Sequence, residues 1–270
     1  MTLVLVRYGE IGLKSEHVRK QFEDLLIADI KKALSHYGIK HKIKKTWGRI
    51  FVEVDDFEQA VKPLKNVFGI TSFSPAAETE ANLESISRAV ADYAKTINKN
   101  ESFAIRARRT GNHDFTSQNV AARAGQAVVD ATHAPVNLKN PDKEIFIEVR
   151  DEKAFIFSKK IEGTGGMPYE SQGKAIGLVK DEKDMLASWL MMRRGCTVEF
   201  VCNKKMKDKI KEKCMWRDVN THVHEENIYA FAESLAIKKG AKAIITGEES
   251  FEKRKLPVFY PLLGFYEVKK

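Results

Sequence analysis

The chain has 270 residues, of which 43% are hydrophobic and 31% charged, a composition typical of a folded globular protein with two or three small domains. Its formal net charge of +9 is compatible with a polyanionic partner such as nucleic acid. No apolar run approaches the ~20 residues of a membrane span, and residues 2–6 are too short for a signal-peptide core, so we expect a cytoplasmic protein without a membrane partner.

The first part of the chain alternates between strand and helix patterns. Apolar residues at three- and four-residue spacing predict a helix that ends near His36, with Ser15 as its N-cap. Strands are expected at residues 3–6, 39–45 and 49–54, and helices at 15–36 and 57–64. This order of elements is typical of a small ferredoxin-like α+β unit, which we place at residues 1–66.

A second α+β unit is expected at residues 67–162. Its predicted elements are strands at 67–75, 102–108, 145–150 and 153–158 and helices at 83–97 and 117–131. In the strand at 102–108 apolar residues alternate with Arg106 and Arg108, which predicts a half-buried strand with arginines on its solvent face.

The last part of the chain begins with a glycine-rich linker, residues 163–172. Strands are then expected at 175–179, 197–201 and 243–246, and helices at 184–194 and 226–239. Strands that alternate with helices predict a parallel, Rossmann-like sheet, hence an α/β domain at residues 173–270.

Several stretches resemble one known family. They are Tyr8-Gly-Glu-Ile-Gly-Leu-Lys-Ser15 with Arg19, Val67-Phe-Gly-Ile70, Phe103-Ala-Ile-Arg-Ala-Arg-Arg109, Gly165-Gly-Met-Pro168 and Ala187-Ser-Trp-Leu-Met-Met-Arg-Arg-Gly195. The chain thereby resembles the sulfurtransferases that make 4-thiouridine in tRNA, the ThiI type. The resemblance implies a ferredoxin-like unit, a THUMP RNA-binding unit and a PP-loop ATPase-like domain, with tRNA held by its acceptor end.

The pyrophosphate-binding loop of that family, Ser-Gly-Gly-x-Asp-Ser, has no counterpart of the same chemistry here. Counted back from Gly195, the matching positions hold Val179 and then Lys180, Asp181, Glu182, Lys183 and Asp184. Backbone amides need glycine to approach a pyrophosphate, and carboxylates at a helix N-terminus take the place of the anion. We therefore expect a degenerate loop that binds ATP weakly or not at all.

A second part of the family's nucleotide site begins with a triplet that matches Thr246-Gly247-Glu248 here. In the family this triplet opens a longer motif, whereas residues 249–255 here read Glu-Ser-Phe-Glu-Lys-Arg-Lys, and the long segment is missing. We therefore expect a truncated PP-loop-type domain in which Gly247 belongs to the same degenerate nucleotide loop.

Cysteines and histidines are the residues that could carry sulfur or metal chemistry in this chain. Cys214 lies among Lys209, Lys211, Lys213 and Arg217, an electropositive setting that suits a reactive cysteine, and it is the one catalytic candidate. Cys196 and Cys202 flank an apolar strand and are expected to be buried. His222 and His224 lack further ligands at a recognised spacing, so no metal is expected.

A candidate RNA-binding surface combines cations with aromatic rings. Arginine neutralises phosphate and stacks on unpaired bases. The candidates are Arg106, Arg108, Arg109, His113 and Phe115 in the THUMP-like region, with Arg7, Lys14 and Arg19 of the first unit on the same face.

Three hypotheses about function stay open. The first is a tRNA-binding protein without ATP-dependent catalysis and without a cofactor. The second is an active tRNA sulfurtransferase, which would adenylate a uridine with ATP and Mg²⁺ and replace the adenylate by sulfur from a cysteine persulfide. The third is a non-catalytic subunit that supplies tRNA to a separate catalytic sulfurtransferase. The resemblance also implies a homodimer, for which the apolar residues 258–265 are a candidate interface.

Overall fold

The computed structural model describes residues 1–46, 48–248 and 255–263, and the chain forms two compact units. Unit 1 comprises Met1–Val6, Lys42–Phe57 and Phe73–Ile161, and unit 2 comprises Arg7–His41, Glu58–Ser72 and Glu162–Lys270. Most of the segment expected to replace the family's long motif, residues 249–254, and the end of the apolar tail, residues 264–265, lie outside the described residues. The expected domain boundaries stay predictions.

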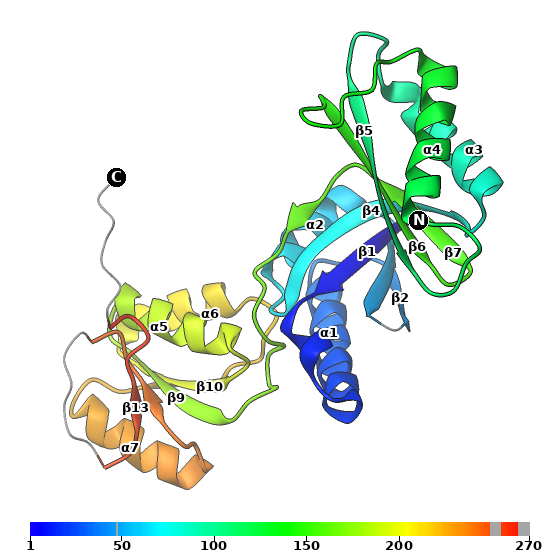
Figure 1. Ribbon diagram of the computed structural model, residues 1–270. Coiled ribbons are helices and arrows are strands. Elements are labelled where there is room, and N and C mark those ends of the chain that lie inside the picture. The colour runs from blue at the N-terminus through cyan, green and yellow to red at the C-terminus, as the bar shows by residue number, and fades with distance from the viewer. Residues whose placement is uncertain (47, 249–254, 264–270) are drawn as a thin grey trace. The chain divides into compact units, whose positions relative to one another are not determined.

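The larger sheet contains eight strands among the described residues, in the order β2-β3-β1-β4-β7-β6-β5, with β8 paired to β4 (Figure 1). The strands are β1 (Thr2–Tyr8), β2 (His41–Thr46), β3 (Arg49–Val54), β4 (Ile70–Glu80), β5 (Phe103–Thr110), β6 (Lys143–Arg150), β7 (Lys153–Phe157) and β8 (Ile161–Glu162). The two strands expected at 145–150 and 153–158 are β6 and β7, which form an antiparallel hairpin in which Asp151 adopts a φ of 49°.

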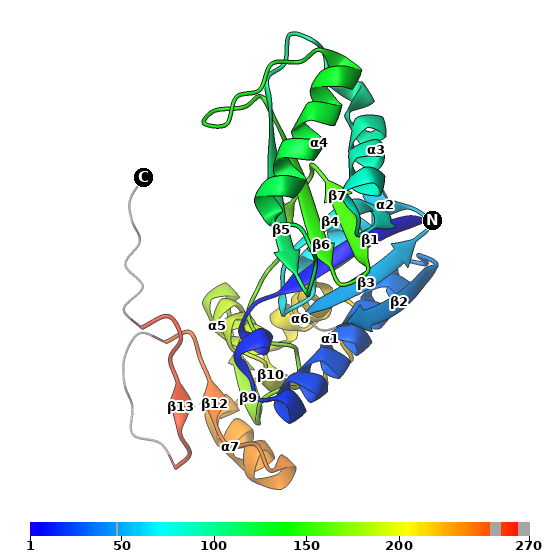
Figure 2. The same cartoon turned by 45° about the vertical axis from the view of Figure 1, so that its right-hand side comes forward.

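Two helices, α3 (Leu83–Tyr93) and α4 (Ser117–Thr132), cover the β5–β7 part of this sheet (Figure 2). A short 3₁₀ turn, η2 (Ala94–Thr96), extends α3. Helix α4 begins with a capping box in which the side chains of Thr116 and Asn119 bond to each other's backbone N–H groups. Its buried stripe packs with Phe103, Ile145 and Ile147 in one apolar core, so β5 and β6 are held rigidly beneath α4.

The smaller sheet is parallel and lies in unit 2. It has five strands among the described residues, in the order β11-β10-β9-β12-β13. They are β9 (Lys174–Val179), β10 (Thr197–Cys202), β11 (Thr221–Val223), β12 (Ile244–Ile245) and β13 (Val258–Phe259). Figure 1 shows α5 (Glu182–Arg193) and α6 (Lys207–Cys214) on one face and α7 (Ile228–Lys239) on the other. The predicted Rossmann-like arrangement is confirmed.

The remaining helical elements include η3 (Lys204–Met206), which leads into α6. Unit 2 also contains η1 (Glu10–Leu13), α1 (Glu16–His36) and most of α2 (Phe57–Asn66). Helix α1 ends at the predicted residue, His36, although the Ser15 side chain makes no capping hydrogen bond.

The expected linker is hydrogen-bonded on both sides. The N–H groups of Gly163 and Gly165 donate to the carbonyls of Thr71 (3.0 Å) and Ile70 (2.7 Å), and the N–H of Met167 donates to Arg193 (2.9 Å). A Cβ at Gly166, where φ is +80°, would lie 2.2 Å from the Arg193 carbonyl oxygen. The glycines thus permit close backbone packing between the start of β4 and the end of α5.

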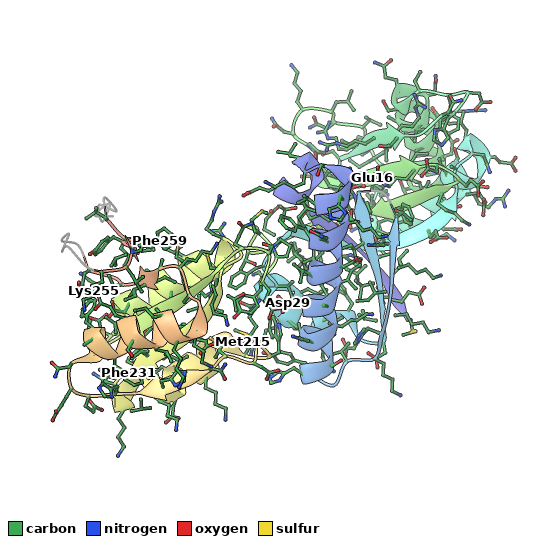
Figure 3. The ribbon with its side chains drawn as sticks, turned by 90° about the horizontal axis from the view of Figure 1, so that it is seen from below. Glu16, Asp29, Met215, Phe231, Lys255 and Phe259 are labelled. Carbon is green, nitrogen blue, oxygen red and sulfur yellow. The ribbon has the colours of Figure 1, made fainter. Side chains whose placement is uncertain are left out.

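Helix α1 is tied to the turn after α6 through Asp29. Its carboxylate accepts hydrogen bonds from Trp216 Nε1 (2.6 Å) and Arg217 Nη2 (3.0 Å), and all three side chains are buried. Figure 3 shows Asp29 of α1 beside the turn at Met215. The contact joins an N-terminal helix to the C-terminal sheet domain within unit 2.

Candidate functional site

The segment after β9 forms the first turn of α5 instead of a loop. Helix α5 starts at Glu182, two residues before the predicted start, because the Asp181 side chain caps it by accepting from the N–H groups of Lys183 (2.9 Å) and Asp184 (3.0 Å). Glu182 points outward and pairs with Lys209. Two amides that could face an anion are therefore already bonded to a carboxylate of the chain.

Asp184 lies 2% exposed between the ends of β9 and β12. One carboxylate oxygen accepts from the N–H of Lys180 (2.9 Å), and the other accepts from the N–H of Gly247 (2.6 Å) and the hydroxyl of Thr246 (2.9 Å). Two backbone amides and a hydroxyl are the type of donor set that a phosphate group would use. In this chain the donors bind an internal carboxylate.

The Thr246–Glu248 segment closes tightly over α5. A Cβ at Gly247 would lie 2.5 Å from the carbonyl carbon of Lys183, so the two backbones are in direct contact. Burial alone would lower the pKa of Lys180, but its hydrogen bond to Glu248 and the charge of Asp184 raise that pKa above its ordinary value. Lys180 is thus a cation engaged by carboxylates of the protein. The donor set present does not fit a nucleotide's phosphates without displacement of Asp184.

The expected exposure of Cys214 is wrong. Its side chain is 1% exposed because Cys214 and Ile210, four residues apart on α6, both face the core beneath α5. Burial raises the pKa of the Cys214 thiol to about 12, although Arg217 acts in the opposite direction. A neutral, buried thiol is a poor nucleophile, so Cys214 lacks the properties of a reactive cysteine.

Cys202 is buried as expected, whereas Cys196 is only partly buried. The two histidines serve the packing of β11. His222 contacts Glu199 (3.4 Å), and the ring of His224 stacks on Phe231 at 4.3 Å between ring centroids. Within the described part of the chain, no group of three or more potential ligands could hold a metal ion.

Arg108 and Arg109 lie together at the end of β5 and are both exposed. They border a cleft of about 520 Å³ in unit 1. The cleft is also lined by Arg49 of β3, Arg150 of β6 and Ser117 of α4. Glu148, the one acidic residue in its lining, is paired with Arg49 at 3.0 Å. The cleft therefore offers a surplus of guanidinium groups to an anionic partner.

The other predicted residues of this region play different parts. Arg106 is paired with Glu144 (2.8 Å) and also donates to the Leu138 carbonyl (3.0 Å). His113 contacts Arg109 Nη1 (3.3 Å) and the Asp151 carbonyl (2.6 Å), and so it orients Arg109. The expectation that Phe115 is available to stack on a base is wrong, because its ring is 8% exposed and belongs to the core under α4.

Arg7, Lys14 and Arg19, the RNA-binding candidates in residues 1–66, belong to unit 2 of the structure. Since Arg108 and Arg109 belong to unit 1, a common face for all five residues stays a prediction. Arg7 is the second-to-last residue of β1, and Arg19 lies in the first turn of α1. Lys14 follows η1 and lines a different cavity, at the amino ends of the strands of the parallel sheet.

Sequence analysis missed Arg49 and Arg150. Arg49 lies 99 residues before Glu148, and only the assembled sheet brings the two side chains together. The one local signal for Arg150 was its place at the end of a predicted strand, where the parallel pairing of β5 and β6 sets it opposite Thr110.

Two family models match the chain. The ThiI ferredoxin-like domain matches residues 3–74, and the THUMP domain matches residues 80–159. Proteins named probable tRNA sulfurtransferase are 31% identical in Methanosarcina mazei and 32% identical in Saccharolobus solfataricus. Each match covers 97% of this chain, and it covers 79% and 83% of the respective relative. The chain belongs to the ThiI-type tRNA sulfurtransferase family.

Family members differ in length from this chain. The match to the Methanobrevibacter smithii protein of the same name is 43% identical but spans about half of that relative, 52%. The alignment with the M. mazei protein extends over 321 positions, more than the 270 residues of the chain. The M. mazei relative therefore carries internal residues that have no counterpart here.

Two solved structures share the fold of the chain. PH1313 from Pyrococcus horikoshii is 33% identical, with a TM-score of 0.85 over 99% of this chain and 96% of that one. A 4-thiouridine synthetase, solved with RNA and ATP, has a TM-score of 0.78 over 98% of this chain and 82% of its own, at 23% identity, and so shares the fold. Among the described residues, no helix is both long and apolar enough to cross a membrane.

Proposed function

We propose that this ThiI-type chain binds tRNA through the arginine cleft of unit 1 and does not use ATP. The observation that carries the second part is the placement of Asp184, whose carboxylate accepts from two backbone amides and a hydroxyl at the ends of β9 and β12. An ATP phosphate would have to displace this carboxylate and would meet its charge at close range, which costs binding free energy.

The tRNA part of the proposal rests on the THUMP match and on the charge of the cleft. Arg108 is exposed and has no ion pair among the described residues, so it can contact a phosphate without breaking a bond within the protein. Arg109 is held in place by Gly111 and His113. The tRNA acceptor end, a homodimer and a cytoplasmic location are finer parts of the same proposal.

The alternative is an active tRNA sulfurtransferase, which the names of the family relatives favour. It requires that Asp184 be displaced and that a cysteine act as the sulfur carrier. Among the three cysteines only Cys196 is partly exposed. A non-catalytic subunit that delivers tRNA to a separate sulfurtransferase is compatible with the main proposal, and co-purification with such an enzyme would support it.

Binding of tRNA by an Arg108→Ala/Arg109→Ala variant tests the cleft. Each lost phosphate contact removes about one unit of slope from log K against log salt concentration, so we expect the slope to fall by about two. Arg123→Ala serves as a control, because Arg123 is exposed on α4 and does not line the cleft. An unchanged slope in the double variant would remove this cleft from the RNA-binding surface.

A further inference from the structure

A second cavity, besides the cleft of unit 1, lies at the amino ends of the strands of the parallel sheet. Asp184 lies at the carboxyl ends of the same strands. Its volume is about 560 Å³, within the range of small-ligand sites. Its wall includes Lys174 at the start of β9, Lys242 just before β12 and Pro257 just before β13. Since β9 has six residues at about 3.3 Å each, this amino-edge cavity is roughly 20 Å from the Asp184 site.

The polar part of the amino-edge cavity is mostly cationic. Arg194 is paired with Glu10 (3.3 Å), and Lys174 lies 3.6 Å from Glu199. The ammonium groups of Lys14 and Lys242 have no ion pair within the described part of the chain. Two lysines without an ion pair in the lining of one cavity suit a doubly charged anion such as a phosphate monoester.

The rest of the amino-edge cavity is apolar. Met167, Met191 and Ala243 form part of its wall, and Phe259 of β13, which is 43% exposed, borders it. Figure 3 labels Phe259. Thioether and aromatic groups adapt to flat rings, and aromatic side chains stack on nucleobases. A simple inorganic anion would leave this surface without a partner, whereas a ligand with a planar body would cover it.

We propose that the amino-edge cavity binds a nucleotide unit, with the phosphate at Lys14 and Lys242 and the base against Met191 and Phe259. The unit comes either from a free nucleoside monophosphate or from an unpaired nucleotide of an RNA. All lining residues belong to unit 2. The proposal goes beyond the proposed function, since neither the arginine cleft nor the Asp184 site takes part.

The reactivity of the Cys196 thiol can show whether the amino-edge cavity is occupied. Cys196 lines it and is partly exposed, while Cys202 and Cys214 are buried, with exposures of 0% and 1%. Burial raises the pKa of the Cys196 thiol, although Arg194 lowers it, so the thiol reacts slowly enough to be followed at mildly alkaline pH. A bound nucleotide would block the thiol sterically, and its phosphate would disfavour the thiolate.

The test is the rate of Cys196 alkylation by iodoacetamide in the native protein, read by mass spectrometry. AMP, UMP and CMP are each added at millimolar concentration, with inorganic phosphate at equal ionic strength as the comparison. We expect at least one nucleotide to slow alkylation severalfold and inorganic phosphate to have a much smaller effect. Cys196→Ser, which should not be labelled, confirms the site of reaction.

Charge-reversal variants test whether Lys14 and Lys242 bind the phosphate of the nucleotide. Lys14→Glu/Lys242→Glu should abolish the protection, whereas Lys238→Glu/Lys204→Glu, an equal charge change at exposed positions outside the cavity, should preserve it. Protection that survives Lys14→Glu/Lys242→Glu would overturn the assignment of the phosphate site. Equal protection by inorganic phosphate and nucleotides, or no protection by any nucleotide or RNA, would overturn the proposal as a whole.

A third arm distinguishes the two sources of the nucleotide. A short single-stranded RNA is added to the chain that carries Arg108→Glu/Arg109→Glu, so that the cleft of unit 1 does not contribute. Stronger protection by the RNA than by the best monophosphate assigns the cavity to an RNA nucleotide. Protection by the monophosphate alone assigns it to a free nucleotide.

Discussion

At the scale of single residues, Asp184 accepts hydrogen bonds from two backbone amides and a hydroxyl, donors of the type that can bind a phosphate. Its carboxylate is the acceptor for donors from two strand ends and is almost completely buried. Removing a charged acceptor of this kind leaves each buried donor unsatisfied. The stability of the α5 N-terminus therefore depends on this side chain.

Asp184→Ala should lower the free energy of unfolding by about 3 kcal/mol, because it leaves several buried donors without a partner. Pyrophosphate or sulfate should then raise the melting temperature of the variant, since an anion can take the vacated place. Glu182→Ala, on the same helical turn but exposed, should change little and show no anion effect. Thermal melts with and without anion check this, and equal anion effects on both variants would contradict it.

The buried thiol of Cys214 should make the free energy of unfolding depend on pH. Burial raises its pKa from 9.0 to about 12, so the contribution of Cys214 is fully present below pH 9 and is lost as the pH rises from 9 to 12. Denaturant unfolding of the native chain and of Cys214→Ala should therefore give a stability difference that shrinks above pH 9. A difference that stays constant to pH 11 would contradict the buried neutral thiol.

Particular residues show how far the sequence could predict these sites. Carboxylates near the start of α5 indicated an internal replacement for an anion, because helix polarity is a local property. The basic neighbours of Cys214 suggested exposure, yet its four-residue spacing from Ile210 on α6 was the better signal of a buried face. The meeting of Arg49 with Glu148 depends on strand order across the large sheet, which local patterns do not contain.

At the scale of elements, the buried pair Asp29–Arg217 fixes α1 against the turn that follows α6. Their side chains are 7% and 4% exposed, and the guanidinium lies 4.2 Å from the ring centroid of Phe68. Together with the hydrogen-bonded glycines of residues 163–166, this contact makes α1 and the parallel sheet domain part of one compact unit.

Asp29→Ala should destabilise the chain by about 3–5 kcal/mol, because it leaves the buried Arg217 charge without a partner. Asp29→Leu/Arg217→Met should recover most of that loss, since it removes both charges and keeps an apolar volume. Urea unfolding monitored by tryptophan fluorescence measures both variants. A loss below 1 kcal/mol in Asp29→Ala would show that the pair does not hold α1 in place.

The glycines of residues 163–166 should also matter for the stability of unit 2, because they allow close backbone packing. Gly166→Ala should destabilise by several kcal/mol, about the cost of a forced left-handed backbone plus a steric overlap. Gly173→Ala is the matched control, because its Cβ would meet nothing within 4 Å. Thermal melting of the two variants checks this, and equal melting temperatures would mean that residues 163–172 behave as a free linker.

At the scale of the whole molecule, the proposed RNA-binding cleft lies in unit 1 and the Asp184 site lies in unit 2. Arg108 in the unit 1 cleft is exposed and has no ion pair among the described residues, whereas the donors at the ends of β9 and β12 are occupied by Asp184. Family membership, shown by relatives that the chain matches over most of its length, supplies the fold on which both sites are built.

The most direct test of the central claim is an isothermal titration of ATP with Mg²⁺, with and without bound tRNA. The titrated chain carries Lys242→Glu, which removes one of the two phosphate contacts proposed for the amino-edge cavity and leaves Lys14, a candidate RNA-binding residue, in place. We predict that tRNA binds to this chain and that ATP gives no binding heat in either case. A micromolar Kd for ATP would contradict the proposal, because it would mean that Asp184 yields its place to the nucleotide, and it would put the sulfurtransferase alternative first.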